Sequence, residues 1–213
     1  MADANIINLI VSTINTLQAT SKYYEVVKDD NGLREAFHEA GRGVYLVGQA
    51  LESANSQLIN RQNLIGDSQR AMNPLESCNT RARLSENVFK IVAEAPETAR
   101  QERYKAAVTQ EGKGNTVEVL VKAMMCDICE LVQRSAIEAV MKDQVKGLRD
   151  AIEKLSMMKP SVPNEEPGHI FANYGSGSQY NTPWGTQNIT TGNGNQFPGA
   201  TFSGSVTFSG NPS

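Results

Sequence analysis

Two cysteines in the second half of the chain, Cys126 and Cys129, have the Cys-x-x-Cys spacing that binds zinc or carries redox chemistry in many proteins. A metal site would need a second cysteine pair or nearby histidines, and a redox site would need a βαβ context. The two histidines, His38 and His169, lie far from this pair in the sequence. Cysteines in an apolar helical stretch are usually small core residues. We therefore predict no catalytic, cofactor-binding or metal-binding residue, and a protein that is not an enzyme.

A glycine-rich segment around Lys113, EGKGNT at 111–116, raises the alternative of a phosphate-binding loop. The Walker pattern requires Gly-x-x-x-x-Gly-Lys-Ser/Thr after a strand. Here Gly114 follows Lys113, no strand pattern precedes the segment, and the position five residues before Gly112 is not glycine. The segment is better explained as the loop before a helix, in which Asn115 and Glu118 have the spacing of a capping box. No nucleotide cofactor is expected.

The C-terminal tail indicates a different chemistry, the stacking of uncharged backbone and side chains. The chain has 20 basic and 23 acidic residues, yet none follows Glu166. Two units in the tail, GSGSQY at 175–180 and GNGNQF at 192–197, share the pattern Gly-x-Gly-x-Gln-aromatic and lie 17 residues apart. The sequence TFSG at 201–204 also recurs, at 207–210.

This tail is too polar to fold by itself. Ordering one residue costs about 1–2 kcal/mol, whereas a fully buried aromatic side chain returns at most about 1.5–3 kcal/mol, so the tail of a monomer should be disordered. In a stack, every backbone group pairs with the layers above and below it, and no column of like charges forms. We predict a cross-β or β-solenoid amyloid with two rungs per molecule, in which the stacking residues are Gly175, Gly177, Gln179, Tyr180, Trp184, Gln187, Asn188, Gly192, Gly194, Gln196, Phe197, Phe202 and Phe208.

Composition excludes several classes of protein. A net charge of −3 argues against a nucleic-acid platform, which would normally be basic. The first residues lack the basic start of a secretory signal, and no stretch has the roughly 18 apolar residues of a membrane span. Three cysteines form no disulfide framework, so a cytoplasmic protein is expected.

Helical periodicity dominates the N-terminal part of the chain. Apolar residues recur at helical spacing from Ile6 to Val27, and a second stripe follows from Leu33 to Leu58. Gly41, Gly43 and Gly48 interrupt this second stripe. Each glycine should weaken an isolated helix by about 1 kcal/mol, so three of them within eight positions indicate a close helix crossing or a bend.

Prolines mark the later boundaries. A third helix is expected to have Pro74 at its first position and to end at Pro96, and a short helix should follow over 97–108. The capping-box start predicts a long final helix from residue 115 to about 158, with Pro160 and Pro163 beyond it. The predicted fold class is all-α, a helical bundle of four or five helices with a long final helix, and the predicted domains are the bundle at 1–158, a Pro-rich linker at 159–172 and the amyloid tail at 173–213.

The first helix is a candidate for contact with membranes. It is uncharged from Ala4 to Ser21, with one apolar face and one face of Asn, Ser and Thr. The residue pattern alone predicts a core helix. Only the family resemblance carried by the motifs below implies a helix that is packed at rest and enters a membrane after activation. The candidate residues for that role are Ile6, Ile7, Asn8, Ile10, Ile14 and Leu17.

Two stretches of the bundle, GLREAFHEAGRGVYLVGQAL at 32–51 and RYKAAVTQEGKGNTVEVLVKAMMCDICEL at 103–131, resemble a HeLo-like, SesA-type domain. This is the N-terminal domain of many fungal NACHT and other STAND NTPases. The tail, with WGTQN between its two units, resembles the sigma motif, an amyloid-forming segment of fungal incompatibility systems. A SesA-like domain and a sigma-like tail in one chain make a more specific signal than either part.

The resemblance implies a function. It implies an effector of programmed cell death or heterokaryon incompatibility, switched on by amyloid templating from a NACHT or STAND NTPase that carries a matching motif. The bundle would then act on membrane lipid, moving from the cytoplasm to the plasma membrane. The alternative is a signalling adaptor or inhibitor that binds tails or bundles without disrupting membranes. An enzyme with an unrecognised site is a third, weaker alternative.

Overall fold

The computed structural model describes residues 2–60, 68–133 and 137–163. These residues form six α-helices and one 3-10 helix, and none of them lies in a strand. The elements are α1 (Ala2–Val27), α2 (Glu35–Asn60), α3 (Ser68–Glu94), η1 (Glu97–Ala99), α4 (Arg100–Gln110), α5 (Val117–Gln133) and α6 (Lys142–Met157). The all-α prediction is confirmed.

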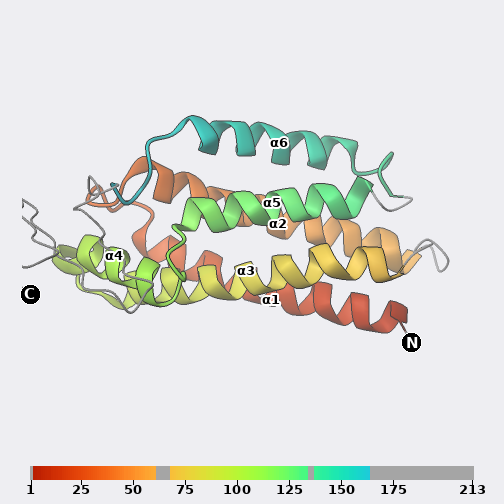
Figure 1. Cartoon of the computed structure of the whole chain (residues 1–213), viewed down its shortest axis with the longest axis horizontal. Coiled ribbons are helices and arrows are strands. Elements are labelled where there is room, and N and C mark those ends of the chain that lie inside the picture. Colours follow the sequence, from red (N-terminus) through yellow and green to blue (C-terminus); the bar gives the residue numbers. More distant parts are fainter. Residues whose placement is uncertain (1, 61–67, 134–136, 164–213) are drawn as a thin grey trace, which may run out of the picture. The chain divides into compact units, whose positions relative to one another are not determined.

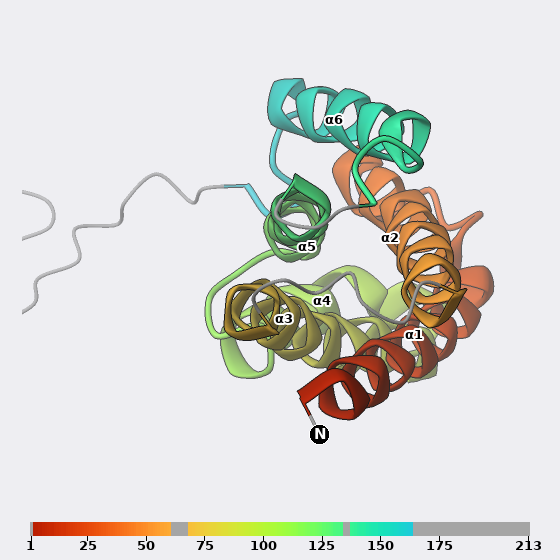
Figure 2. The ribbon, with the colours of Figure 1, turned by 90° about the vertical axis from the view of Figure 1, so that its right-hand side faces the viewer.

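The long helices form a bundle in which successive long helices run in opposite directions (Figure 1). Helix α1 packs along α3 and α2, and α5 packs against α2, α3 and α6. The core contains an aromatic cluster in which the ring centroid of Phe37 lies 4.9 Å from those of Phe89 and Tyr104. Helix α6 lies at the edge of the bundle, next to α5 and α2 (Figure 2).

Two of the three glycines in α2 are sites of close helix approach. A Cβ atom on Gly41 would lie 2.4 Å from ring atoms of Tyr24 on α1, and one on Gly43 would lie 2.6 Å from Cε of Met125 on α5. A Cβ atom on Gly48 would meet nothing within 4 Å. The predicted close crossing is therefore confirmed at Gly41 and Gly43, and Gly48 takes no part in it.

The prediction of one long final helix is wrong. Helix α5 ends at Gln133, and α6 begins at Lys142 and runs back antiparallel to α5 (Figure 1). In the turn before α6, the amides of Val140 and Met141 both donate to the Ile137 carbonyl, at 3.0 and 3.1 Å. A continuous helix of this length would extend about 65 Å and leave its second half without a partner. The reversal instead buries four α6 side chains, those of Val145, Leu148, Ala151 and Leu155.

The predicted start of the third helix is also wrong, whereas its end is confirmed. Helix α3 begins at Ser68, so Pro74 lies inside it rather than at its first position. Proline inside a helix removes one backbone hydrogen bond and costs about 3 kcal/mol or more. Burial of Ala71 and packing of Met72 against the core offset part of this cost. The helix ends at Glu94, two residues before Pro96.

Candidate functional site

The apolar face of α1 forms part of the bundle core. Four of its members, Ile6, Ile10, Ile14 and Leu17, are buried. Ile7 is half-buried at the margin, and Asn8 is exposed. The structure thus places the candidate membrane residues on two sides of one helix, with the large aliphatic side chains facing inward.

Two threonines on the buried side of α1 satisfy their hydroxyl groups within the helix. Thr13 donates to the Leu9 carbonyl and Thr20 to the Thr16 carbonyl, both at 2.8 Å. A hydroxyl that bonds to the preceding turn needs no partner from another helix. The Thr13 hydroxyl also lies 3.3 Å from Oδ1 of Asn79 on α3, which adds a weaker polar contact to the packing that holds α1 in place.

The C-terminal half of α1 is tied to α2 by aromatic and polar contacts. The ring of Tyr24 fills the space above Gly41. The Tyr45 hydroxyl donates to the Glu25 carboxylate at 2.5 Å. Burial, together with this hydrogen bond, raises the pKa of Tyr45 to about 12. The hydrogen bond from Tyr45 in turn lowers the pKa of Glu25.

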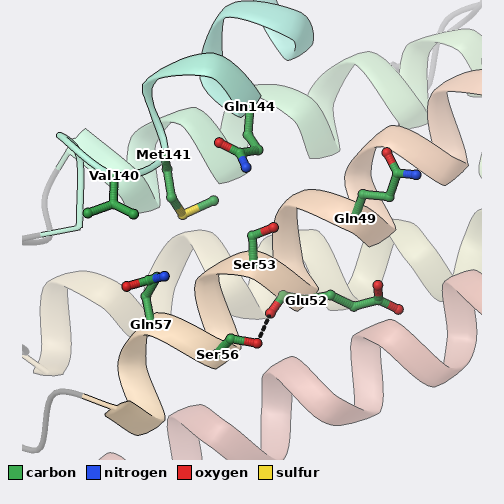
Figure 3. A pocket seen from close by; sticks show the side chains of 8 residues that line it. All are labelled: Gln49, Glu52, Ser53, Ser56, Gln57, Val140, Met141 and Gln144. Carbon is green, nitrogen blue, oxygen red and sulfur yellow. Dashed lines mark hydrogen bonds between the residues drawn. The ribbon is translucent and has the colours of Figure 1, made fainter.

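A polar groove of about 530 Å³ lies between α2 and the start of α6 (Figure 3). Within it, the Ser56 hydroxyl donates to the Glu52 carbonyl at 2.9 Å. Its lining offers amides, hydroxyls and one carboxylate, which can bind a peptide but do not form a nucleophile and base pair. The lining residues are Gln49, Glu52, Ser53, Ser56, Gln57, Val140, Met141 and Gln144.

An ion pair between Asp127 on α5 and Arg81 on α3 lies at the interface of these helices. Only 13% of the Asp127 side chain is exposed. Burial raises the pKa of Asp127 to about 6, and the attraction of Arg81 offsets this only in part. Desolvation of the carboxylate outweighs its Coulomb gain, as expected for a half-buried ion pair.

A buried polar cluster joins α4, α5 and the segment after α6. We call Tyr104, Glu118 and Ser161 the Ser161 cluster. Glu118 accepts from the Ser161 amide at 2.9 Å and from the Ser161 hydroxyl at 2.6 Å. The Tyr104 hydroxyl lies 2.6 Å from the Ser161 hydroxyl and accepts from the Val117 amide at 3.2 Å. Burial raises the pKa of Tyr104.

The contacts of Glu118 show that the capping-box prediction is wrong. The sequence did not predict the Ser161 cluster. The Glu118 carboxylate bonds to Ser161 rather than to the backbone of Asn115, whose side chain donates to the Gly112 carbonyl at 3.1 Å. The only sequence signal was an acidic residue within the apolar run Val117–Val121. Such a residue suggests a buried carboxylate, but not its partner.

The structure also shows where the cysteine pair, His38 and the loop at Lys113 lie. Cys129 is buried, as predicted for a core residue, whereas Cys126 is exposed, so that prediction is wrong for Cys126. His38 is buried and its Nε2 donates to the Asp30 carbonyl at 2.9 Å. Lys113 has a φ of 51° and Gly114 a φ of 80°, which form the turn between α4 and α5.

The described ranges contain no group of three or more His, Cys, Asp and Glu residues that could hold a metal ion. None of the helices in these ranges combines the length and the apolar character needed to cross a bilayer. His169 and all the predicted stacking residues, from Gly175 to Phe208, lie outside the described residues.

These observations define an all-helical domain followed by an uncharged tail. The chain belongs to the SesA family, described as the N-terminal domain on NACHT NTPases and P-loop NTPases, whose model matches residues 10–131. A second model, the sigma domain on NACHT NTPases, matches residues 168–209. No curated protein and no solved structure matches the chain.

The two matches confirm the resemblance drawn from the sequence, in the same order along the chain. Both regions are ones that accompany a NACHT NTPase, and neither is its catalytic nucleotide-binding domain. The protein therefore has an effector or signalling role associated with NACHT NTPases.

Proposed function

We propose that this protein is an effector of programmed cell death or heterokaryon incompatibility. A partner NACHT or STAND NTPase with a matching motif templates the tail into an amyloid. The assembled protein then moves from the cytoplasm to the plasma membrane, where its helical bundle acts on lipid. The observation that carries the proposal is the presence of both matches, at 10–131 and 168–209, on one chain.

The composition of the tail supports the templating step. The 168–209 match lies entirely after Glu166, the last charged residue. Identical segments stack in register in an amyloid, so with two rungs per molecule a charged residue would repeat along the fibril about every 9.6 Å. A segment without charge avoids this repulsion, and the units at 175–180 and 192–197 supply equivalent glutamine and aromatic positions.

The packing of α1 supports a bundle that stays inactive until it is triggered. Fully burying an aliphatic side chain contributes about 1.5–3 kcal/mol, so Ile6, Ile10, Ile14 and Leu17 together contribute about 6–12 kcal/mol. This is comparable to the whole free energy of unfolding of a typical domain, about 5–15 kcal/mol. Release of α1 therefore needs an external driving force, which assembly of the tail and contact with lipid would supply.

A second candidate function is a signalling adaptor or inhibitor that binds tails or bundles without acting on lipid. The burial of the same α1 face favours it, because a helix whose aliphatic side chains complete the core can be purely structural. The polar groove between α2 and α6 would then be one surface for a peptide partner.

A liposome experiment separates the two candidates. Fibrils of residues 165–213, verified by cross-β diffraction, are added to the full chain in the presence of dye-loaded liposomes. We expect leakage only when the full chain and the fibrils are both present. Fibrils that recruit the full chain without leakage would support the adaptor. A tail that stays unassembled after long incubation with seeds would refute the templating step.

A further inference from the structure

The segment that connects α6 to the tail is fastened to the bundle by the Ser161 cluster. Ser161 is 5% exposed, although it lies only two residues from the last described residue. Its amide and its hydroxyl both bond to the buried Glu118 carboxylate, and the hydroxyl also contacts Tyr104. The carbonyl of Pro160 accepts from Arg34 at 3.1 Å. Any force applied through the tail reaches this cluster first.

Helix α6 is held by the same end. It lies at the edge of the bundle and packs mainly on α5 and α2 (Figure 2). Met158 and Val162, which follow the end of α6 at Met157, both pack against the core. The Lys154 ammonium near its C-terminus donates to Glu39 on α2 at 2.6 Å. Contacts that share one end of a helix tend to open together as one cooperative unit.

We propose that α6 and residues 158–163 separate from the rest of the bundle as one cooperative unit. The Ser161 cluster holds this unit on the bundle, and we call this set of contacts the lock. Assembly of the tail breaks these contacts and opens the unit. The last step rests on the proposed function, because it needs the amyloid. The part of the bundle that responds directly to assembly is then the outer helix α6, which lies next to the tail in the chain. Release of α1, at the opposite end of the sequence, would follow this opening and contact with lipid.

Crowding in the fibril supplies the force. Two rungs per molecule would place successive chains about 9.6 Å apart along the fibril. A domain of this size has a radius of gyration of about 15 Å, so it is at least about 30 Å wide. The eleven residues between Pro163 and Gly175, the first predicted stacking residue, span at most about 40 Å. Bundles about 30 Å wide that are attached about every 9.6 Å compete for space around the fibril, and opening the unit lengthens the connection.

The lock can be tested in the unassembled full chain by hydrogen exchange. Ser161→Asp places a second carboxylate beside Glu118 and removes the hydroxyl bonds. The matched control is Ser156→Asp, since Ser156 is exposed on α6 and lies outside the cluster. We expect Ser161→Asp to speed exchange of the α6 amides by at least about tenfold, because the loss of hydrogen bonds to a charged group shifts an equilibrium by more than that factor. Exchange in α1 and α3 should be unchanged. The control should change exchange less than about twofold, as is usual for surface substitutions.

Two results would overturn the lock. Faster exchange confined to 158–163 would show that α6 does not open with the cluster, and equal acceleration in all helices would show global destabilisation. If Ser161→Asp does not fold, Ser161→Ala keeps the backbone bond to Glu118 and should still speed α6 exchange by at least about threefold. No change in that variant would also reject the proposal.

The assembly step is tested by lengthening the connection. A ten-residue Gly-Ser insertion after Pro163 relieves crowding without touching the cluster or the tail. In fibrils of the parent chain, α6 should exchange at least about tenfold faster than in the unassembled protein, and the insertion should restore protection. Equal protection of α6 in both states of the parent, or an insertion without effect, would overturn this step. Failure of either chain to assemble would refute the proposed function and the assembly step together, while the Ser161 comparison decides the lock independently.

Discussion

Alanine at Gly41 and at Gly48 should change stability in opposite directions, although both glycines lie in α2. Replacing an interior helical glycine by alanine favours the helix by about 1 kcal/mol. At Gly48 nothing lies within 4 Å of the new Cβ atom, so Gly48→Ala should stabilise the fold by about that amount. At Gly41 the Cβ atom would lie 2.4 Å from atoms of the Tyr24 ring, which is far inside van der Waals contact.

The cost at Gly41 follows from the rigidity of its neighbour. Overpacking of a well-packed site costs about 1–3 kcal/mol, and an aromatic ring held between helices can yield little, so the upper end applies. After subtraction of the helix-propensity gain, Gly41→Ala should destabilise the fold by about 2 kcal/mol. Gly43→Ala should fall between the other two variants, because the flexible end of Met125 can move away, whereas Cγ1 of the stiffer Val121 side chain would lie 2.8 Å from the new atom.

Thermal unfolding of the full chain, followed by circular dichroism at low concentration, measures the contrast. One kcal/mol shifts Tm by about 2–4 °C for a chain of this size, so Gly41→Ala should lower Tm by about 4–8 °C and Gly48→Ala should raise it by about 2–4 °C. A Tm for Gly41→Ala at or above that of the parent would refute the close α1–α2 crossing. A lower Tm for Gly48→Ala would show that another group covers that position.

Four further substitutions test the remaining parts. Asn8→Asp should change the free energy of unfolding by less than about 0.5 kcal/mol, because Asn8 is exposed. It should nevertheless abolish liposome leakage, because an aspartate at the bilayer centre costs about 2.5–3.5 kcal/mol. Full leakage by a normally folded variant would count against insertion of α1. Gln196→Lys should block seeded assembly, because it places a column of charges along the fibril. Phe197→Ala should only slow seeded assembly. Normal seeding of the lysine variant in a thioflavin assay would disprove the layer assignment. The pKa of Asp127 is raised to about 6, so protonation of its carboxyl group favours the folded state. The stabilisation of the fold by this proton is complete below the ordinary pKa of about 3.9 and is lost as the pH rises through 6. Urea unfolding should therefore show the stability of the parent, relative to that of Asp127→Asn, increasing as the pH falls from about 8 to about 5, and a difference independent of pH would contradict this assignment.

Local patterns in the sequence determined most of the helical content and the division of the chain. The apolar spacing from Ile6 to Val27 predicted α1, which ends at Val27. This was possible because residues three or four positions apart lie on the same face of a helix. Pro96 marked the end of α3, since proline cannot continue a helix. The loss of charge after Glu166 located the tail, and the aliphatic face of α1 was predicted by spacing alone.

Only the tertiary structure decided the features that depend on a distant partner. Neither glycine nor proline marks the reversal between α5 and α6, which forms because α6 can then bury its apolar face on α2 and α5. Gly41 and Gly48 are the same residue in the same helix, yet only Gly41 faces an aromatic ring of another helix. Glu118 has the spacing of a cap, but its carboxylate bonds to Ser161, 43 residues away. Such contacts are stabilised by burial between segments that are remote in sequence, and no local pattern records which segments meet.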